Sequence, residues 1–548
     1  MGIKTLCIAI TLVFSFKLVF AQVYSELWGQ TGEKWSYDSR LPDFSYAGYH
    51  TGEVALPDVA IVANVMDFGA VGDGEADDTQ AFLDAIAGTE NGALWVPAGK
   101  YKITDILEIK KSNLVIRGEG MSKSTLVFPI PLNDIKPNWG STTGGRPTSN
   151  YSWSGGFIWV EGSFRSTHLA DVTQPATRGD RSLVLSKTEN LNPGQRVEIR
   201  MEDLDDNSLA SHLYSDDPGN MTKLAGRTHA SLVVTILEIQ GNTIYFDRPL
   251  RFDIELRWTP EIIRYDPTVT EVGIEDLAFE FPAIPYEGHF TELGNNPLTF
   301  RNVANSWARN LLFKNPDSGP MLNSRFCTFV NLHYQSQREP DNSGNRGHHG
   351  VYLQNDDNLF TGFDFGTTFI HDITVSHNAG NVISNGKGMN LALDHHKRAP
   401  YANLFTHLDA GAGTRLWKSG GGADLGRHSA GHETFWNITA LNSIPAPGDF
   451  GPWSLNRVGL TSDEPSETDL EGIWQENIPP EQLIPQNLHE AQLLKRLEYR
   501  KNKCPFDHSS TDHPRVRKGP APGFPAADLL APGSAFPLGK GEVLKEGP

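Results

Sequence analysis

The sequence predicts an all-β chain that forms one single-stranded parallel β-helix, in which short strands stack coil upon coil. Glycine and proline, with 53 and 35 of 548 residues, make up about 16% of the chain, above the usual ~12%, so turns are frequent. Short phrases of Asn or Asp followed by Leu or Ile recur through the middle of the chain. Strands do not alternate with long amphipathic helices, as an α/β fold would require.

The recurring phrases are the main evidence for stacked coils. They are Asn310-Leu311, Asn331-Leu332, Asn358-Leu359, Asp372-Ile373, Asn403-Leu404 and Asn437-Ile438. Their spacings of 21, 27, 14, 31 and 34 residues suit coils of twenty-odd residues with loops of varying length. An Asn or Asp that enters each strand can bond its neighbours in a side-chain ladder. We therefore expect the β-helix to occupy residues 61–460.

Composition excludes several classes of function. The formal net charge of −19 is opposite to that of a general nucleic-acid binder. Charged residues at 21% and hydrophobic residues at 38% exclude a disordered chain. Only the extreme N-terminus has an apolar run near membrane-spanning length. We expect a monomer with no nucleic-acid partner and no membrane span in the mature chain.

The N-terminus has the features of an export signal. Lys4 precedes an apolar stretch over residues 6–20, and Val19-Phe20-Ala21 offers small residues where a signal peptidase cleaves. A membrane anchor is the alternative, but Lys17 interrupts the short run. The sequence predicts a signal peptide at residues 1–21 and an exported protein, periplasmic or secreted.

The segment after the lead-in has the sharpest local pattern. Gly72 and Gly74 suit a tight turn, and Asp77 or Asp78 can start a short helix. The phrases at residues 67–74, 77–81, 96–101 and 118–120 resemble the opening of the pectate-lyase-like right-handed parallel β-helix enzymes. The resemblance implies a right-handed, pectin-lyase-like β-helix with a short N-terminal capping helix. It does not imply one activity, because pectinases, glucanases, lyases and phage tailspikes share this opening.

The C-terminal part differs in composition. Residues 485–500 have the apolar period of one amphipathic helix, and the tail from Cys504 is rich in proline and glycine. The predicted organisation is a signal peptide at 1–21, a lead-in at 22–60, the β-helix catalytic domain at 61–460, and a helix with an irregular tail at 461–548.

Histidines and cations are concentrated in one region. Nine of the 18 histidines lie between His348 and His432. Cations outnumber acids between His395 and His432, and we predict that they bind substrate: Lys397, Arg398, Arg415, Lys418 and Arg427. A local basic surplus in an acidic chain is what an anionic oligo- or polysaccharide partner would need.

The spacing of three histidines predicts a common face. His349, His395 and His428 precede the phrases at Asn358, Asn403 and Asn437 by eight or nine residues. If these asparagines start equivalent strands, the histidines form a column on coils about 4.8 Å apart. The candidate catalytic residues are His349, His395, His396, His428 and Tyr401. The alternative is a polar ladder without catalytic function.

No metal site is predicted from these residues. His428 and His432 could ligate zinc, but the chain has no His-Glu-x-x-His motif and no cysteine in this region. No cofactor is predicted, although calcium bridging an acidic substrate stays open.

A second resemblance concerns activity. Residues 394–405, 415–421, 426–429 and 434–438 resemble β-helix proteins of polysaccharide-degrading marine bacteria, in particular the ulvan oligosaccharide dehydratase and related uronate lyases. The resemblance implies a carbon–oxygen lyase that acts by β-elimination on ulvan-like, uronic-acid-containing saccharides. It is either an oligosaccharide dehydratase or a chain-cleaving polysaccharide lyase.

The residues suit this reaction. A histidine can remove the C5 proton, Tyr401 or a second histidine can protonate the leaving oxygen, and nearby cations can stabilise the charge that develops. A glycoside hydrolase is the first alternative and would use paired carboxylates from Asp356, Asp357, Asp394 and Asp424. A non-catalytic glycan-binding β-helix is the second.

Overall fold

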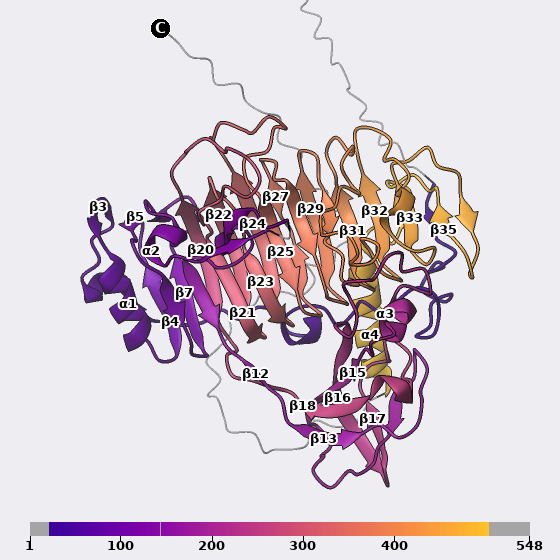
Figure 1. The fold of residues 1–548 in the computed structure, drawn as a ribbon. Helices are drawn as coiled ribbons and strands as arrows, with labels where there is room; N and C mark the ends of the chain where they lie inside the picture. The colour runs from indigo at the N-terminus through magenta and orange to yellow at the C-terminus, as the bar shows by residue number, and fades with distance from the viewer. Residues whose placement is uncertain (1–20, 143, 504–548) are drawn as a thin grey trace, which may run out of the picture. The chain divides into compact units, whose positions relative to one another are not determined.

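The chain is the predicted right-handed parallel β-helix (Figure 1). The computed structural model describes residues 21–142 and 144–503. Of the described residues, 21–142 and 144–499 belong to one compact unit, to which the following description applies, and 500–503 are assigned to a second unit. Residues 1–20 of the predicted signal peptide and the predicted tail from Cys504 lie outside the described residues. Within these residues, no helix is long and apolar enough to cross a membrane.

Two large sheets run along the coils. The larger sheet pairs, mostly in parallel, β2 (Ile61–Asn64), β3 (Asp73–Asp77), β4 (Gly92–Val96), β5 (Gly99–Lys102), β7 (Leu114–Gly118), β8 (Ser124–Val127), β20 (Gly273–Glu280), β22 (Trp307–Lys314), β24 (Thr328–Gln335), β26 (Leu359–Thr361), β27 (Asp364–Phe365), β29 (Val382–Gly388), β31 (Leu404–Asp409), β32 (Thr434–Thr439), β33 (Asn456–Leu460), β34 (Glu467–Thr468) and β35 (Trp474–Glu476). The second sheet pairs β6 (Leu107–Ile109), β11 (Ile158–Glu161), β21 (Leu298–Ala304), β23 (Met321–Arg325), β25 (His349–Gln354), β28 (His371–Val375) and β30 (Leu393–His395).

Left-handed residues bend the strands of the larger sheet. β20 pairs with β7 before its bend at Asp276 and with β8 after it. The equivalent positions on successive coils have φ between 52 and 66° and are Asp276, Asn310, Asn331, Gly362, Asn385, His407, Asn437 and Gly459. Gly, Asn, Asp and His tolerate this conformation best. Three of the predicted strand-starting asparagines, Asn310, Asn331 and Asn437, therefore lie inside strands.

A second asparagine column stands before the strands, where the ladder was predicted. The side-chain amide of Asn358 donates to the Asn381 side-chain oxygen at 3.0 Å, and Asn381 donates to Asn403 at the same distance. Asn403 then donates to Glu433 at 2.7 Å. All four side chains are buried. The ladder is confirmed here, because neighbouring coils satisfy one another's buried polar groups.

Apolar side chains fill the space inside the coils. Phe279, Phe313, Tyr334 and Phe365 form a row with ring centroids 4.2–5.4 Å apart. Other short elements are α1 (Thr79–Gly88), α2 (Leu132–Ile135), α4 (Leu488–Lys503), β1 (Val23–Tyr24), β36 (Leu483–Ile484), β9 (Trp139–Ser141) and β10 (Pro147–Ser149). The helix predicted after Asp78 is α1, which packs Phe82 into this core.

The lead-in and the last helix cover the outside of the larger sheet. Leu41 and Phe44 from the lead-in and Leu488 from α4 join one buried cluster with Leu404 and Trp436 of the sheet. The Trp436 indole donates to the Pro485 carbonyl at 2.7 Å. Segments at the two ends of the sequence are therefore packed against the same coils.

An antiparallel insertion interrupts the coils between β11 and β20. Its elements, below the coils in Figure 1, are β12 (Phe164–Arg165), β13 (His168–Asp171), β14 (Ser182–Val184), β15 (Arg196–Glu202), α3 (Ser208–Leu213), β16 (His229–Gln240), β17 (Thr243–Phe246), β18 (Glu261–Arg264) and β19 (Asp266–Pro267). The insertion has its own core around Ile199, Leu232 and Trp258. The less regular sequence over residues 130–260 already favoured a large insertion at this place.

Buried ion pairs attach this insertion to the coils. Arg248 donates to both carboxylate oxygens of Asp357 at 2.8 and 3.0 Å, and Arg251 also bonds this carboxylate. All three side chains are at most 5% exposed. A Cβ on Gly380, whose φ is +69°, would lie 2.1 Å from the Arg251 guanidinium. Gly380 therefore gives Arg251 the room to reach Asp357.

Candidate active site

Five histidines gather on the outer side of the second sheet. His349 begins β25 and His371 begins β28, and the two are paired in register with stacked rings 5.0 Å apart. His396 follows β30, and its ring centre lies 5.4 Å from that of His371. His348 precedes β25, and His289 comes from the long segment before β21. We call these five residues the histidine cluster.

Asp394 holds two rings of the cluster. Its Oδ2 lies 2.9 Å from His396 Nδ1 and 3.2 Å from His371 Nδ1. The Thr374 hydroxyl donates to Oδ2 and the Gly420 N–H donates to Oδ1. Burial would raise the pKa of Asp394, but His371 and His396 outweigh this effect and hold it well below its usual range. A charged carboxylate thus orients both imidazoles.

Glu292 lies at the other end of the cluster. His289 Nε2 and His348 Nε2 are 2.8 Å apart, and His348 Nδ1 lies 3.7 Å from Glu292 Oε2. Burial raises the pKa of Glu292 to about 7, and Tyr286 donates to its other oxygen. Burial lowers the pKa of His289 and His371 to about 4. These two imidazoles are therefore uncharged at neutral pH, with a lone pair available on each ring.

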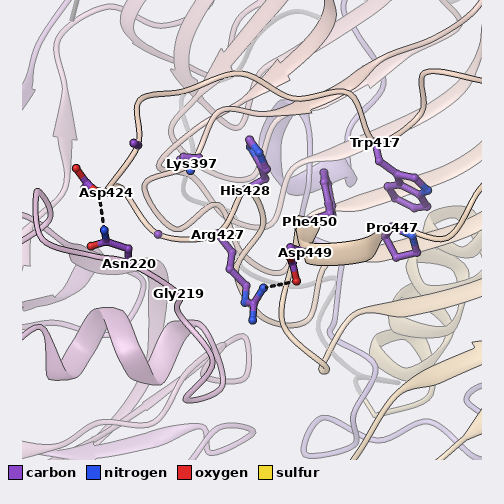
Figure 2. Close-up of a pocket in the computed structure, with 12 residues that line it drawn as sticks. Gly219, Asn220, Lys397, Trp417, Asp424, Arg427, His428, Pro447, Asp449 and Phe450 are labelled. Atoms are coloured by element: carbon purple, nitrogen blue, oxygen red, sulfur yellow. Dashed lines mark hydrogen bonds and ion pairs between the residues drawn. The ribbon is translucent and has the colours of Figure 1, made fainter.

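A cavity of about 680 Å³ lies beside Lys397, the residue that follows His396 (Figure 2). The main side chains that line it are Lys397, Trp417, Asp424, Arg427, His428, Asp449 and Phe450. Asn220 of the insertion bonds Asp424 across one side of the cavity. Arg427 contacts Asp449 at 3.4 Å and Asp217 of the insertion at 2.7 Å. Insertion and coils therefore build this cavity together, and its lining combines two cations and two acids with aromatic rings.

One loop borders both the cluster and the cavity. A Cβ on Gly420 would lie 2.8 Å from the Cε1 atoms of both His371 and His396. A Cβ on the next residue, Gly421, would lie 3.1 Å from Cγ of Lys397. His396 faces the cluster while its neighbour Lys397 lines the cavity. The cavity and the histidine cluster are therefore connected through two consecutive residues, His396 and Lys397.

The structure brings most predicted site residues into these two places. His349 and His396 are in the cluster, and Lys397, Arg427 and His428 line the cavity. Lys418 is exposed on the loop that borders both. The pKa of His371 is lowered mainly by burial, and the charges of His396 and Lys418 contribute to this lowering.

Four predicted residues lie elsewhere. His395 is fully buried inside the coils against Phe405 and Phe450, because side chains alternate along β30. Tyr401 belongs to the core of the insertion. Arg415 donates to the carbonyls of Phe369 and Ile370. Arg398 lines a separate cavity of about 340 Å³.

The predicted histidine column is wrong in its register. His349 pairs with His371, whereas His395 pairs with Val375, four positions further along the strand. The prediction combined two asparagine columns: Asn437 is equivalent to the bend at His407, and the residue equivalent to Asn403 is Glu433. The cluster is formed by neighbours in space, with different offsets along the chain.

His289 was the main residue that sequence reasoning missed. It lies 59 residues before His348, in a segment without strand phrases. His428 and His432, which were considered as zinc ligands, lie in different surroundings. His428 lines the cavity. Burial lowers the pKa of His432 well below its ordinary value, and the charges of Arg178 and Arg40 add to this effect. A histidine beside Glu292 in a long loop was the available signal, and only the fold gives it meaning.

Comparison with known families supports the fold. Residues 62–129 match the family model described as rhamnogalacturonase A/epimerase, pectate lyase-like. This match confirms the resemblance of the opening phrases. The fold is a pectate-lyase-like right-handed β-helix, a fold of carbohydrate-active proteins.

Curated relatives match only short segments. Mannuronan C5-epimerase AlgE3 of Azotobacter vinelandii is 34% identical over 100 residues, which are 17% of this chain and 5% of the epimerase. Alginate lyase 7 of the same bacterium is 40% identical over 72 residues, 12% of this chain and 8% of the lyase. The chain thus matches less than a tenth of the length of either relative.

Solved structures show distant similarity. The Gp54 tailspike of Acinetobacter baumannii bacteriophage AP22, solved with capsular saccharide, is 11% identical with a TM-score of 0.41, covering 70% of this chain and 59% of the tailspike. An exopolygalacturonase of Thermotoga maritima is 10% identical with a TM-score of 0.30, covering 75% and 74% of the two chains.

Proposed function

We propose that the protein is a carbon–oxygen lyase that acts by β-elimination on uronic-acid-containing saccharides, ulvan-like ones among them. The observation that carries the proposal is His396, a partly exposed imidazole held by the buried carboxylate of Asp394 beside Lys397. This arrangement combines an oriented base with a cation. Abstraction of a proton next to a carboxylate needs both.

The reaction can be assigned to named groups. His396 takes the C5 proton, and the electron pair of the C5–H bond forms the C4–C5 double bond as the C4–O bond breaks. Lys397 offsets the charge that develops on the substrate carboxylate. His428, which lines the cavity, protonates the leaving oxygen in this proposal. If that oxygen leaves as water the enzyme is a dehydratase, and if it belongs to a sugar it is a chain-cleaving lyase.

The names of the matched relatives support a uronate substrate. Mannuronan C5-epimerase and alginate lyase are both named for chemistry on uronate polymers. An epimerase removes the same C5 proton and returns one to the opposite face of the ring. It is therefore the second candidate, and the product distinguishes it from a lyase.

The hydrolase alternative has less support from the carboxylates. Asp356 and Asp357 are buried beside arginines, and Asp394 is enclosed by histidines. Asp424 bonds Asn220. A hydrolase needs two carboxyl groups that face one bond, separated by about 5–10 Å. Each of these four carboxyl groups is instead engaged by arginine, histidine or asparagine side chains.

The test is incubation with ulvan, alginate and polygalacturonate oligosaccharides. Ultraviolet absorbance of an unsaturated uronate is expected, with a product one water lighter for a dehydratase or shorter fragments for a lyase. Solvent deuterium at C5 without absorbance would indicate an epimerase. His396→Ala should abolish turnover. His407→Asn is the control, because His407 is an exposed histidine at a bend position that tolerates asparagine. New reducing ends without unsaturation would overturn the proposal in favour of a hydrolase.

We also propose that the protein is exported, on the basis of the signal-like residues 1–21. N-terminal sequencing of protein from the native host should begin at Gln22. An intact N-terminus would contradict this proposal.

A further inference from the structure

The histidine cluster contains two groups of side chains with metal-ligand geometry. His289, His348 and His371 each place one ring nitrogen within 4.8 Å of the others. His371, Asp394 and His396 form a second such group that shares His371. Three ligand atoms at such separations can surround one ion at ordinary zinc–nitrogen distances of about 2.0–2.1 Å.

The three imidazoles of the first group converge through particular atoms. His289 Nε2 and His348 Nε2 approach to 2.8 Å, so both rings point to the same spot. Nδ1 of His348 and Nδ1 of His371 are buried and make no hydrogen bond. Each instead lies near a buried carboxylate, at 3.7 Å from Glu292 and 3.2 Å from Asp394.

This pattern is typical of a metal centre with its supporting residues. A histidine that binds a metal through one nitrogen usually presents the other N–H to a carboxylate, which fixes the ring and increases its basicity. Glu292 and Asp394 occupy that place for His348 and His371. Tyr286 and the Gly420 N–H bond the two carboxylates in turn, so the carboxylates are themselves held in position.

We infer that His289, His348 and His371 bind one divalent transition-metal ion, with zinc as the best match to the three nitrogens. Calcium and magnesium prefer oxygen ligands, and this group offers only imidazoles. Three protein ligands leave a fourth position open, as in catalytic rather than structural zinc sites. Asp394 and His396 lie next to this group, because they share His371 with it in the second set of possible ligands.

The inference goes beyond the proposed function and does not depend on it. An ion at this place could hold an anionic group such as a carboxylate of a ligand in the adjoining cavity. Metal binding is measured without any saccharide, so a protein that binds zinc but performs no elimination would separate the two proposals.

The experiment uses the purified chain after treatment with a chelator. Zinc is added, excess is removed by dialysis, and bound metal is counted by plasma mass spectrometry, with about one ion per chain expected. Cobalt(II) replaces zinc in a parallel sample, and intense visible absorption of four-coordinate cobalt is expected. Failure of the wild-type chain to retain zinc or show this spectrum would overturn the inference.

Variants locate the ion. His348→Ala and His371→Ala should each weaken zinc binding at least tenfold, while His407→Asn, at a bend position that tolerates asparagine, should bind as the wild type does. Circular dichroism checks that each variant is folded, and His348→Gln provides a more conservative change. If His396→Ala loses the ion and His348→Ala keeps it, the ion occupies the second group and the assigned ligand set is wrong.

Discussion

Two buried aspartates in this protein have opposite surroundings. Asp357 and Asp394 are each at most 1% exposed. Arg248 and Arg251 enclose Asp357 at the junction with the insertion, and His371 and His396 enclose Asp394 in the histidine cluster. In both cases burial would raise the pKa of the aspartate, and the partners named here outweigh this effect and lower the pKa.

The difference between the two sites lies in their partners. Arginine is always charged and has no lone pair to offer, so the junction at Asp357 can only hold two parts of the fold together. Imidazole can gain a proton, lose one or bind a metal. A buried aspartate carboxylate therefore has a structural function at Asp357 and, as we propose, a chemical function at Asp394.

The largest expected effect is on turnover. Asp394→Asn removes the charge that orients His371 and His396, and we expect turnover of uronate oligosaccharides to fall by about 10²–10⁴, the usual effect of losing an effective general base. Initial rates of unsaturated product measure this. Asp364→Asn, which removes an acid paired with Lys387 on the larger sheet, is the control. An equal loss of turnover in Asp394→Asn and Asp364→Asn would contradict a specific role of Asp394 in the reaction.

The next effect is on stability. Asp357→Asn leaves two arginines buried without their counter-ion, so the free energy of unfolding should fall by about 3–5 kcal/mol. Denaturant titration measures this. Asp58→Asn breaks an exposed ion pair with Arg117 and should cost less than about 1 kcal/mol. A small loss at Asp357 would show that the junction does not depend on its charge.

Lys397 tests the cavity beside Asp394. Lys397→Ala should lower kcat/KM by about 10², the low end of the effect of losing one preorganised electrostatic contact. Lys387→Ala is the matched control, because Lys387 is exposed and paired with Asp364. Kinetics on substrates with free and with methyl-esterified carboxyl groups measure the effect, because the ester keeps the C5 proton acidic but removes the negative charge. A loss that is the same for both substrates would argue against carboxylate recognition.

A smaller effect is expected at Gly420, which connects Asp394 to the loop. The added methyl group of Gly420→Ala would lie 2.8 Å from carbon atoms of His371 and His396, so the rings must shift. Zinc affinity should fall about tenfold, as for changes to residues that support metal ligands. Zinc titration measures this, with Gly144→Ala as the control for general effects, because Gly144 is exposed and an added Cβ would meet only Thr142 Oγ1, at 3.8 Å.

The smallest effect concerns pH and Asp357. Its folded pKa is depressed, so its stabilising contribution is complete above the unfolded value near 3.8 and is lost as pH falls through the lower folded pKa. The difference in unfolding free energy between wild type and Asp357→Asn should be constant above about pH 4 and shrink by at most about 1.4 kcal/mol per pH unit below it. A difference that shrinks between pH 7 and 5 would contradict this assignment.

Local patterns were sufficient for the fold. The short helix after Asp78 depends on neighbouring residues, which the sequence displays directly. The predicted turn differs in detail, because Gly74 lies inside β3, although Gly72 and Gly74 both have a positive φ. The recurring asparagines also predicted stacked coils, because left-handed bends and buried ladders both select Asn. For the same reason the sequence could not separate Asn437, at a bend, from Asn403, in a ladder.

The candidate site depended on tertiary structure. His395 and His396 are adjacent in sequence, but strand alternation places one inside the coils and the other in the cluster. His289 joins His348 only because a long loop folds back over the coils. The sequence by itself determined the repeating architecture and the surplus of histidines and cations. Coil register and loop placement decided which of those side chains meet, because contacts between distant segments depend on packing that no local pattern records.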